Sequence, residues 1–191
     1  MTIEQEEPDF LPELHGPRIH LRPLEGKDAS LFFEVVHADK TALGQWLPWV
    51  EGMISPKHAA SFLAAAEIQQ EMGNGGIWGV FLRKHLIGAV TLHWIQWEHM
   101  AASLGYWLCH SSQGQGLATE ACQLALRHCF VQLGLNRVEL SVATDNQPSL
   151  TLARRLGLRE EGLRRQYERL HGVFHDHISF AMLAEDYLLL A

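Results

Sequence analysis

Residues 113–118, with the sequence QGQGLA, have the residue types and spacing of an anion-binding site. They follow an apolar stretch, residues 101–108, and open an Ala- and Leu-rich stretch, residues 116–133, so the order predicts a strand, a glycine turn and a helix. Glycines allow a ligand close to the backbone, and the first N–H groups of a helix have no partner within it. Because these groups carry the positive end of the helix dipole, the segment predicts a phosphate-binding site.

The glycine segment matches neither of two well-known nucleotide motifs. A P-loop has Lys followed by Ser or Thr after its last glycine, whereas Leu117 and Ala118 follow Gly116. A dinucleotide-binding fingerprint needs a third glycine early in a βαβ unit, and Thr119 stands at that position in the middle of the chain. The site is therefore expected to serve another kind of phosphate ligand.

A second polar turn, TDNQPS at residues 144–149, follows a predicted strand. Asp145 or Asn146 can cap the next helix, and Pro148 suits its first turn. Ser149 follows in the first turn, where its hydroxyl can satisfy a backbone N–H.

His110 is the first candidate for a general base. It stands two residues after the predicted strand at residues 101–108, and an unperturbed imidazole titrates at about 6.5. A solvent-exposed turn histidine is an equal interpretation, because the chain has 12 His. Glu98, His99 or a water relay without a dedicated base are the alternatives.

His175 and His177 would lie on one face of a strand, as metal ligands can. No cysteine or further ligand cluster completes the set. We therefore expect a surface or strand-end pair and no metal site.

Residues 41–55 contain two tryptophans, Trp46 and Trp49, on either side of Leu47-Pro48. The segment is expected to be a loop. Its rings either pack on the core as a lid or line a substrate cleft, since loops carry recognition residues and Trp offers a large rigid surface.

The elements that position these residues follow from hydrophobic periodicity and from Gly and Pro stops. Predicted strands cover residues 18–23, 77–81, 86–94, 101–108, 137–142, 158–163 and 174–182. Predicted helices cover 27–36, 56–72 and 116–133, and a fourth begins after the cap at Asp145 or Asn146 and ends at Gly157. Gly88 is expected to mark a bulge. Residues 1–16 are expected to form an extended arm, because Pro8, Pro12 and Pro17 block a helix. The order predicts a mixed α/β single domain, with helices covering a sheet built mostly of hairpins.

Length and composition limit the function classes. With 191 residues, 47% of them hydrophobic and 19% charged, the chain suits one soluble globular domain. The net charge of −7 argues against a general nucleic-acid binder, because phosphate contacts need a basic patch. It would favour a cationic substrate such as an amine, or it serves solubility alone.

The cysteines and the first residues indicate the compartment. The 3 cysteines contain no CxxC pair, which suggests a reducing compartment and neither a disulfide framework nor a zinc site. The acidic residues 1–7 lack the apolar segment of a signal peptide, and no apolar run approaches the ~18 residues that cross a membrane. We therefore expect a cytoplasmic protein without membrane contact.

The glycine segment and its surroundings together resemble one family. Gln113-x-x-Gly116-x-Ala118 resembles the Q/R-x-x-G-x-G/A loop with which GNAT N-acetyltransferases bind the pyrophosphate of acetyl-CoA. Other similar segments are GYWL at 105–108, Asn146-x-x-Ser149, RLGL at 155–158, EG at 161–162 and the closing residues 172–176. RPL at 22–24 and WLPW at 46–49 resemble the branch that acetylates N-terminal amines of ribosomal proteins, the ribosomal-protein-serine and -alanine N-acetyltransferases. The resemblance covers about residues 17–183.

The resemblance implies an α/β (α+β) GNAT fold in one domain over residues 17–191. It implies a mixed, mostly antiparallel sheet of about seven strands, splayed in a V and flanked by about four helices, with acetyl-CoA in the V. The expected substrate-binding residues are Trp46, Trp49 and Tyr106. The expected cofactor-binding residues are Trp107, Leu108, Cys109, Gln113, Gly114, Gln115, Gly116, Leu117, Ala118, Thr119, Asn146 and Arg154.

For the chemistry, the resemblance implies direct attack of an amine on the thioester, without an acyl-enzyme. Ser149 is then expected to protonate or hydrogen-bond the leaving thiolate. His110 stands where this branch often carries an acidic residue, so it is the candidate base. Residues 150–158 lack the Tyr acid that family members often place after the second cofactor helix.

The predicted reaction transfers an acetyl group from acetyl-CoA to a primary amine, foremost the N-terminal α-amine of a protein such as a ribosomal protein. One alternative acceptor is a small amine, such as an antibiotic, a polyamine or an amino-acid analogue. A non-catalytic acyl-CoA-binding or sensing module is another alternative, which the Cys109-His110 departure keeps open. The expected partners are the acceptor and a second copy in a homodimer, without direct nucleic-acid contact.

Overall fold

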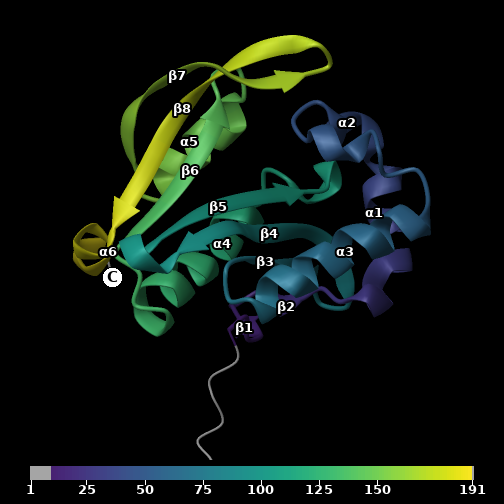
Figure 1. Ribbon diagram of the computed structural model, residues 1–191, viewed down its shortest axis with the longest axis horizontal. Helices are drawn as coiled ribbons and strands as arrows, with labels where there is room; N and C mark the ends of the chain where they lie inside the picture. Colours follow the sequence, from purple (N-terminus) through teal and green to yellow (C-terminus); the bar gives the residue numbers. More distant parts are fainter. Residues whose placement is uncertain (1–9, 191) are drawn as a thin grey trace, which may run out of the picture.

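One mixed sheet runs through the molecule. The computed structural model describes residues 10–190. Its strands are β1 (Leu14–His15), β2 (Ile19–Pro23), β3 (Gly76–Leu82), β4 (His85–Gln96), β5 (Ala101–Leu108), β6 (Arg137–Ala143), β7 (Arg159–Leu170) and β8 (Val173–Leu183). Within these residues the eight strands are ordered β1-β2-β3-β4-β5-β6-β8-β7 (Figure 1). Neighbouring strands are antiparallel, except that β5 and β6 are parallel.

Helices cover both faces of the sheet. They are α1 (Ala29–Ala38), α2 (Lys40–Gly44), α3 (Pro56–Glu71), α4 (Leu117–Arg127), α5 (Gln147–Arg155) and α6 (Ala184–Leu190). Figure 1 shows α1 and α3 on one face of β2 to β4, α4 on the opposite face and α5 beside β6. Short helical turns lie at Gly26–Asp28, Pro48–Val50, Trp97–His99, His110–Ser112 and His128–Gln132, the last of π type.

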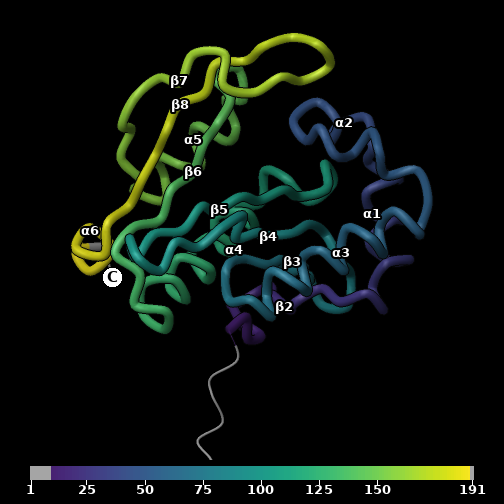
Figure 2. Tube along the Cα trace, viewed as in Figure 1, coloured from purple at the N-terminus to yellow at the C-terminus, as the bar shows by residue number. Residues whose placement is uncertain are grey.

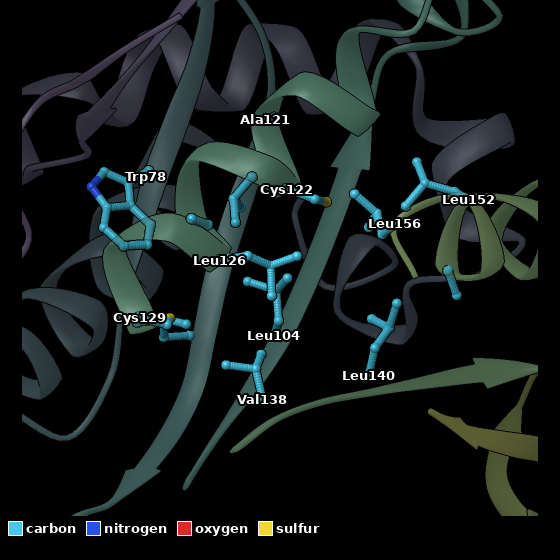
Figure 3. Packing of buried hydrophobic residues seen from close by; sticks show 14 of the residues in the cluster. Trp78, Leu104, Ala121, Cys122, Leu126, Cys129, Val138, Leu140, Leu152 and Leu156 are labelled. Atoms are coloured by element: carbon cyan, nitrogen blue, oxygen red, sulfur yellow. The ribbon is translucent and has the colours of Figure 1, made fainter. Parts of the chain in front are cut away.

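Alternation along β5 divides the core between the two faces. Leu104 belongs to the cluster that includes α4, whereas Trp107 belongs to the cluster beneath α1 and α3. On α4, Cys122 and Leu126 are buried at a spacing that forms one apolar stripe. Figure 3 shows Leu126 beside Leu104 of the sheet. Because β5 is covered on both faces, its end is held firmly where the glycine turn begins.

The strands β5 and β6 separate after a short parallel contact. They pair only from Ala101 opposite Arg137 to Ser103 opposite Glu139. Beyond Ser103, β5 has no strand partner on this side within residues 10–190. Figures 1 and 2 show the two strands opening as a V. The splay leaves backbone N–H and C=O groups of β5 for another partner.

The β7–β8 hairpin reaches across to α2. Its tip is His171-Gly172, where both residues have positive φ angles of 48° and 83°. The His171 imidazole lies with Nδ1 2.8 Å from Glu51 Oε1 and Nε2 2.7 Å from the Gly44 carbonyl oxygen. Figure 1 shows the hairpin tip and α2 approaching each other beyond the end of β5. The hairpin therefore closes one side of the V.

Residues 10–16 pack against the sheet. Leu11 is fully buried, and the indole N–H of Trp78 donates a hydrogen bond of 2.9 Å to the Pro12 carbonyl. Arg18 then connects this region to α4 through an ion pair of 2.7 Å between its Nε and Glu120 Oε2. Of the arm predicted over residues 1–16, residues 1–9 lie outside the described residues, and the rest belongs to the packed domain.

The predicted elements are present, with four differences. The strand β1 brings the described strands to eight where about seven were expected. The loop predicted for residues 41–55 is confirmed in part: residues 45–47 and 51–55 are turns and coil, whereas the rest belong to α2 and the turn Pro48–Val50. The strand β7 continues beyond the predicted end at residue 163, and α6 was not predicted. The bulge expected at Gly88 is confirmed by a register shift between β3 and β4 beside it.

Candidate active site

A cavity lies at the open end of the V. Its volume is about 460 Å³, a size typical of small-molecule sites. Residues of the α2 region, the end of β5, the start of α4 and one side of α5 line it. These segments come from distant parts of the sequence, so the fold is what assembles the site.

The glycine turn has the geometry of a phosphate cradle. Gly114 and Gly116 have φ angles of 71° and 77°, a left-handed conformation that disfavours side chains. Gly116 is the N-cap of α4, so the N–H groups of the next three residues have no partner within the helix. The hydroxyl oxygen of Thr119, in this first turn, is buried and has no hydrogen-bond partner among the described residues. Free N–H groups and an unpaired hydroxyl suit the oxygens of a pyrophosphate.

The open edge of β5 offers a second set of polar groups. The Cys109 N–H donates to the Ile87 carbonyl of β4 at 2.8 Å, and backbone direction alternates along an antiparallel pair. The N–H and C=O groups of Tyr106 and Leu108 therefore face away from β4, into the V. The Leu108 carbonyl accepts a hydrogen bond of 2.9 Å from the Gln113 side chain. The backbone N–H and C=O groups of Tyr106 remain for a ligand in the V, and they would suit one with amide groups.

Ser149 and Tyr106 meet across the V. The two hydroxyl oxygens lie 2.8 Å apart, and both residues are partly buried. The side-chain oxygen of Asn146 accepts the Ser149 N–H at 3.2 Å and thereby caps α5. Burial raises the pKa of the Tyr106 phenol, so it stays protonated at neutral pH. The site thus holds two neutral hydroxyl groups in direct contact.

The structure brings most of the predicted site residues to this cavity. The catalytic candidates Ser149 and His110 line it, as do Trp46 and Tyr106. The predicted cofactor-binding residues that line it are Trp107, Leu108, Gln113, Gly114, Gly116, Leu117, Ala118, Thr119 and Asn146. The predicted residues that do not line it are Cys109, Gln115, Arg154 and Trp49.

Cys109 and Gln115 are engaged beside the cavity. The Cys109 N–H is bonded to β4, and burial raises the pKa of its thiol to about 11. The Gln115 side chain donates to the Ser111 carbonyl at 3.1 Å, and the Gln115 carbonyl accepts from Arg18 at 2.8 Å. Both residues shape the turn instead of entering the cavity.

Arg155 lines the cavity in place of Arg154. The Arg154 guanidinium lies 3.2 Å from Glu160 Oε2, on another side of α5. Residues that share one helix face recur every three or four positions, and Pro148, Leu152 and Arg155 follow that spacing. Counting the helix phase from Pro148 is the sequence signal that would have found Arg155.

The two tryptophans have different surroundings. Trp46 lines the cavity, as a substrate-binding residue would. Trp49 stacks on Phe32 and Phe62 at centroid distances of 6.0 and 5.0 Å, in the core beneath α1 and α3. The lid interpretation therefore describes Trp49, and the cleft interpretation describes Trp46.

Of the candidate bases, His110 lies at the cavity. Its side chain is exposed, and its backbone N–H donates to Asp39 Oδ2 at 2.5 Å. Glu98 and His99 precede β5, an 8-residue strand that is roughly 25 Å long, and His110 follows it. The two fallback residues therefore lie at the wrong end of this strand.

His175 and His177 have acidic partners on neighbouring segments. His175 Nδ1 lies 3.3 Å from Asp145, and His177 Nε2 lies 3.1 Å from Glu168. Burial lowers the pKa of His177, and its Nδ1 lies 3.1 Å from Ser141 Oγ. Within residues 10–190, no group of three or more His, Cys, Asp or Glu side chains could hold a metal ion.

A second cavity adjoins the first between α2 and the β7–β8 hairpin. Its volume is about 620 Å³, and Gln45 lines both cavities. Leu170 and Val173 supply apolar surface, while Lys40 and Glu51 supply charges of both signs. The two cavities together extend from the glycine turn to the hairpin tip.

Comparison with known proteins identifies the family. Residues 18–159 match the family model of the acetyltransferase (GNAT) domain. The chain belongs to the GNAT family. The ribosomal-protein-serine acetyltransferase of Escherichia coli (strain K12) is 29% identical to this GNAT protein over 175 residues, which cover 91% of this chain and 93% of that protein.

Two solved structures that contain coenzyme A share the fold of this chain. RimL, a ribosomal alpha-N-protein acetyltransferase solved in complex with coenzyme A, superposes with a TM-score of 0.87 at 25% identity, covering 90% of this chain and 97% of that one. RimJ from Mycobacterium smegmatis, in complex with CoA-disulfide, gives a TM-score of 0.83 at 28% identity, covering 91% and 87%. This GNAT protein is an acetyl-CoA-dependent N-acetyltransferase. Within residues 10–190, no helix is both long and apolar enough to cross a membrane.

Proposed function

We propose that this enzyme acetylates the N-terminal α-amine of a protein, with ribosomal proteins as the foremost candidates. The observation that carries the proposal is the pair of adjoining cavities that share Gln45. The cavity at the glycine turn suits the acetyl donor, and the cavity under the hairpin suits the residues behind the reacting amine. The ribosomal relatives named above support the same acceptor. Such an acceptor would place the enzyme in the cytoplasm, beside ribosomes.

The donor site is proposed to combine the glycine turn, β5 and the start of α5. The first N–H groups of α4 and the Thr119 hydroxyl would hold the pyrophosphate, and Arg155 would neutralise part of its charge. The backbone of Tyr106 would bond the pantetheine chain, in the manner of a neighbouring strand. This arrangement would direct the thioester toward the base of the V.

The proposed reaction is direct attack of the neutral amine on the thioester carbonyl. A bond forms between nitrogen and the acetyl carbon, and the carbon–sulfur bond breaks with its electron pair on sulfur. The proton lost by nitrogen balances the proton gained by sulfur. Ser149 is positioned by the Asn146 cap to donate a proton or a hydrogen bond to that sulfur. His110, or water beside it, would accept the proton from the incoming ammonium.

An acceptor panel tests this proposal. Thiol release from acetyl-CoA would be measured with peptides that begin with Ser or Ala and with small amines such as a polyamine and an aminoglycoside. The proposal predicts that kcat/KM for at least one of the peptides exceeds that for every small amine. Turnover confined to the small amines would overturn the protein acceptor while leaving the N-acetyltransferase activity in place.

A further inference from the structure

A hydrogen bond between two hydroxyl groups bridges the V beyond the point where its strands separate. Strand pairing between β5 and β6 ends at Ser103 opposite Glu139. Tyr106 lies further along β5, and Ser149 lies on α5, which follows β6. Their oxygens are nevertheless 2.8 Å apart. The bond therefore connects the two arms of the V at the cavity wall.

Either hydroxyl could donate this hydrogen bond, and the greater acidity of a phenol favours Tyr106 as the donor. A serine hydroxyl has one donor hydrogen and two acceptor lone pairs, and a phenol is the more acidic partner. The Ser149 N–H is already directed to the Asn146 side chain, so the start of α5 is fixed. If Tyr106 donates, the Ser149 hydrogen is free to point into the cavity. If Ser149 donated to Tyr106, its only hydrogen would be used up.

Burial keeps the Tyr106 phenol protonated, so it retains a hydrogen to donate. The Tyr106 ring packs against the cluster that includes α4, and burial raises the pKa of its phenol. The phenol therefore stays protonated over the pH range in which an amine acceptor loses its proton. A tyrosinate could only accept a hydrogen bond, and it would turn the Ser149 hydrogen away from the cavity.

We propose that Tyr106 is a positioning residue for Ser149, whose hydroxyl it orients toward the leaving sulfur by donating a hydrogen bond to Ser149 Oγ. The proposal deepens the proposed function and rests on its Ser149 step. It gives Tyr106 a role other than the substrate contact expected from the sequence. The Tyr106 side chain acts through Ser149 and takes no proton from the acceptor.

The test compares Tyr106→Phe, Ser149→Ala and the double variant, with Tyr187→Phe as a matched control. Phenylalanine keeps the buried ring and removes only the hydroxyl. The control residue Tyr187 lies on α6, where its ring stacks on Phe130 away from the cavity. For each variant, kcat, KM for acetyl-CoA and the dissociation constant for coenzyme A would be measured with one acceptor.

The expected result is a split between kcat and KM. Tyr106→Phe lowers kcat about tenfold, the effect of losing one hydrogen bond, and changes KM for acetyl-CoA by less than about twofold. Ser149→Ala lowers kcat about 10²-fold. Adding Tyr106→Phe to the Ser149→Ala variant lowers kcat no further. Tyr187→Phe behaves as wild type. Each of three results would overturn the proposal. They are a wild-type kcat in Tyr106→Phe, a wild-type kcat in Ser149→Ala, and a loss of kcat in the double variant that equals the product of the two single losses.

The series also separates this proposal from the proposed acceptor. If the wild-type enzyme acetylates only small amines, the protein acceptor is wrong, and the same variants are compared with the best small amine. If it acetylates no acceptor in the panel, the variants are compared by acceptor-free hydrolysis of acetyl-CoA, in which the same thiolate must leave. The same three results decide the proposal in either case.

Discussion

At the scale of single residues, two adjacent arginines on α5 have different surroundings. Arg155 lines the cavity at the glycine turn, whereas Arg154 is paired with Glu160. We predict that Arg155→Ala raises KM for acetyl-CoA about tenfold, because one charge-assisted contact to phosphate is lost. The increase should shrink as salt is raised, since the contact lies at an exposed surface.

Arg154→Ala is the matched control for this prediction, because it removes the same charge from the neighbouring position. Steady-state kinetics at low and high ionic strength measure both variants. An equal rise in KM for the two would contradict a specific contact from Arg155 and indicate a general effect of net charge.

We predict that Trp49 of the WLPW segment stabilises the fold, whereas Trp46 contributes to substrate binding. Trp49→Ala should lower the free energy of unfolding by roughly 3 kcal/mol, because a partly buried ring leaves the core beneath α1 and α3. Trp46→Ala should change stability by less than about 1 kcal/mol and raise KM for the acceptor. Urea unfolding measures the change in stability, and steady-state kinetics measure the change in KM. A large loss of stability in Trp46→Ala together with a raised KM in Trp49→Ala would contradict both roles.

The sequence predicts a site residue well when a cap or a turn fixes its position. It predicts poorly which of two neighbours on a strand or helix faces the V. The glycine turn, Asn146 and Ser149 could be placed from their motifs, since each is fixed by a cap or a left-handed backbone. Cys109 and Arg154 could not, because only strand pairing or helix phase decides which neighbour faces the V. The Tyr106–Ser149 contact joins positions that only the splay of β5 and β6 brings together.

At the scale of elements, the β7–β8 hairpin is held to α2 by a histidine contact that depends on pH. The partners of His171 are the Glu51 carboxylate and the Gly44 carbonyl, and both are acceptors. Both ring nitrogens can donate only when the imidazole is protonated. The Gly44 carbonyl and then Glu51 accordingly raise the pKa of His171. Nearby groups are Lys40, whose Nζ lies 3.4 Å from the Glu51 carbonyl, Arg169 at the tip and His175 in the second cavity.

The sign of the pH dependence follows from the raised pKa. A group whose folded pKa lies above its unfolded value stabilises the fold fully below the unfolded pKa, and the contribution is lost as pH rises through the folded pKa. The difference in unfolding free energy between wild type and His171→Ala should therefore be larger at about pH 5.5 than at about pH 8.5. Denaturant unfolding at the two values measures it, with the exposed His85→Ala as control. A difference that grows with pH would refute the contact.

The sequence predicts elements well where one face is buried and poorly where none is. The strands β3 to β6 and the helix α4 have clear apolar patterns, and all are present. The second half of β7 is an exposed edge segment rich in arginine, so it has no alternation to detect. The α2 region is too short for a helical period to be visible before its packing is known.

At the scale of the whole molecule, the V makes the fold and the cofactor interdependent. Acetyl-CoA would bridge the two arms where the described strands make no pairing, so it should bind the folded state alone. At 100 times its dissociation constant, such a ligand stabilises by about 2.7 kcal/mol. We predict that acetyl-CoA raises the melting temperature by roughly 5–10 °C, given the size of the domain.

Differential scanning calorimetry with acetyl-CoA, and with acetate as control, measures this coupling. A melting temperature that does not change with acetyl-CoA concentration would contradict a donor site in the V.

The homodimer expected from the sequence stays a prediction, and sedimentation of the protein in solution is the measurement that decides it.

We propose that the enzyme delivers the acetyl group to the α-amine of a polypeptide. The most direct measurement uses two peptides of one sequence that begins with Ser and contains an internal Lys, one with a free α-amine and one with that amine blocked. Mass spectrometry after incubation with enzyme and acetyl-CoA locates the added group. We predict one acetyl group on the α-amine of the free peptide and none on the blocked one. Acetylation of the lysine side chain, at equal rates in both peptides, would contradict the claim.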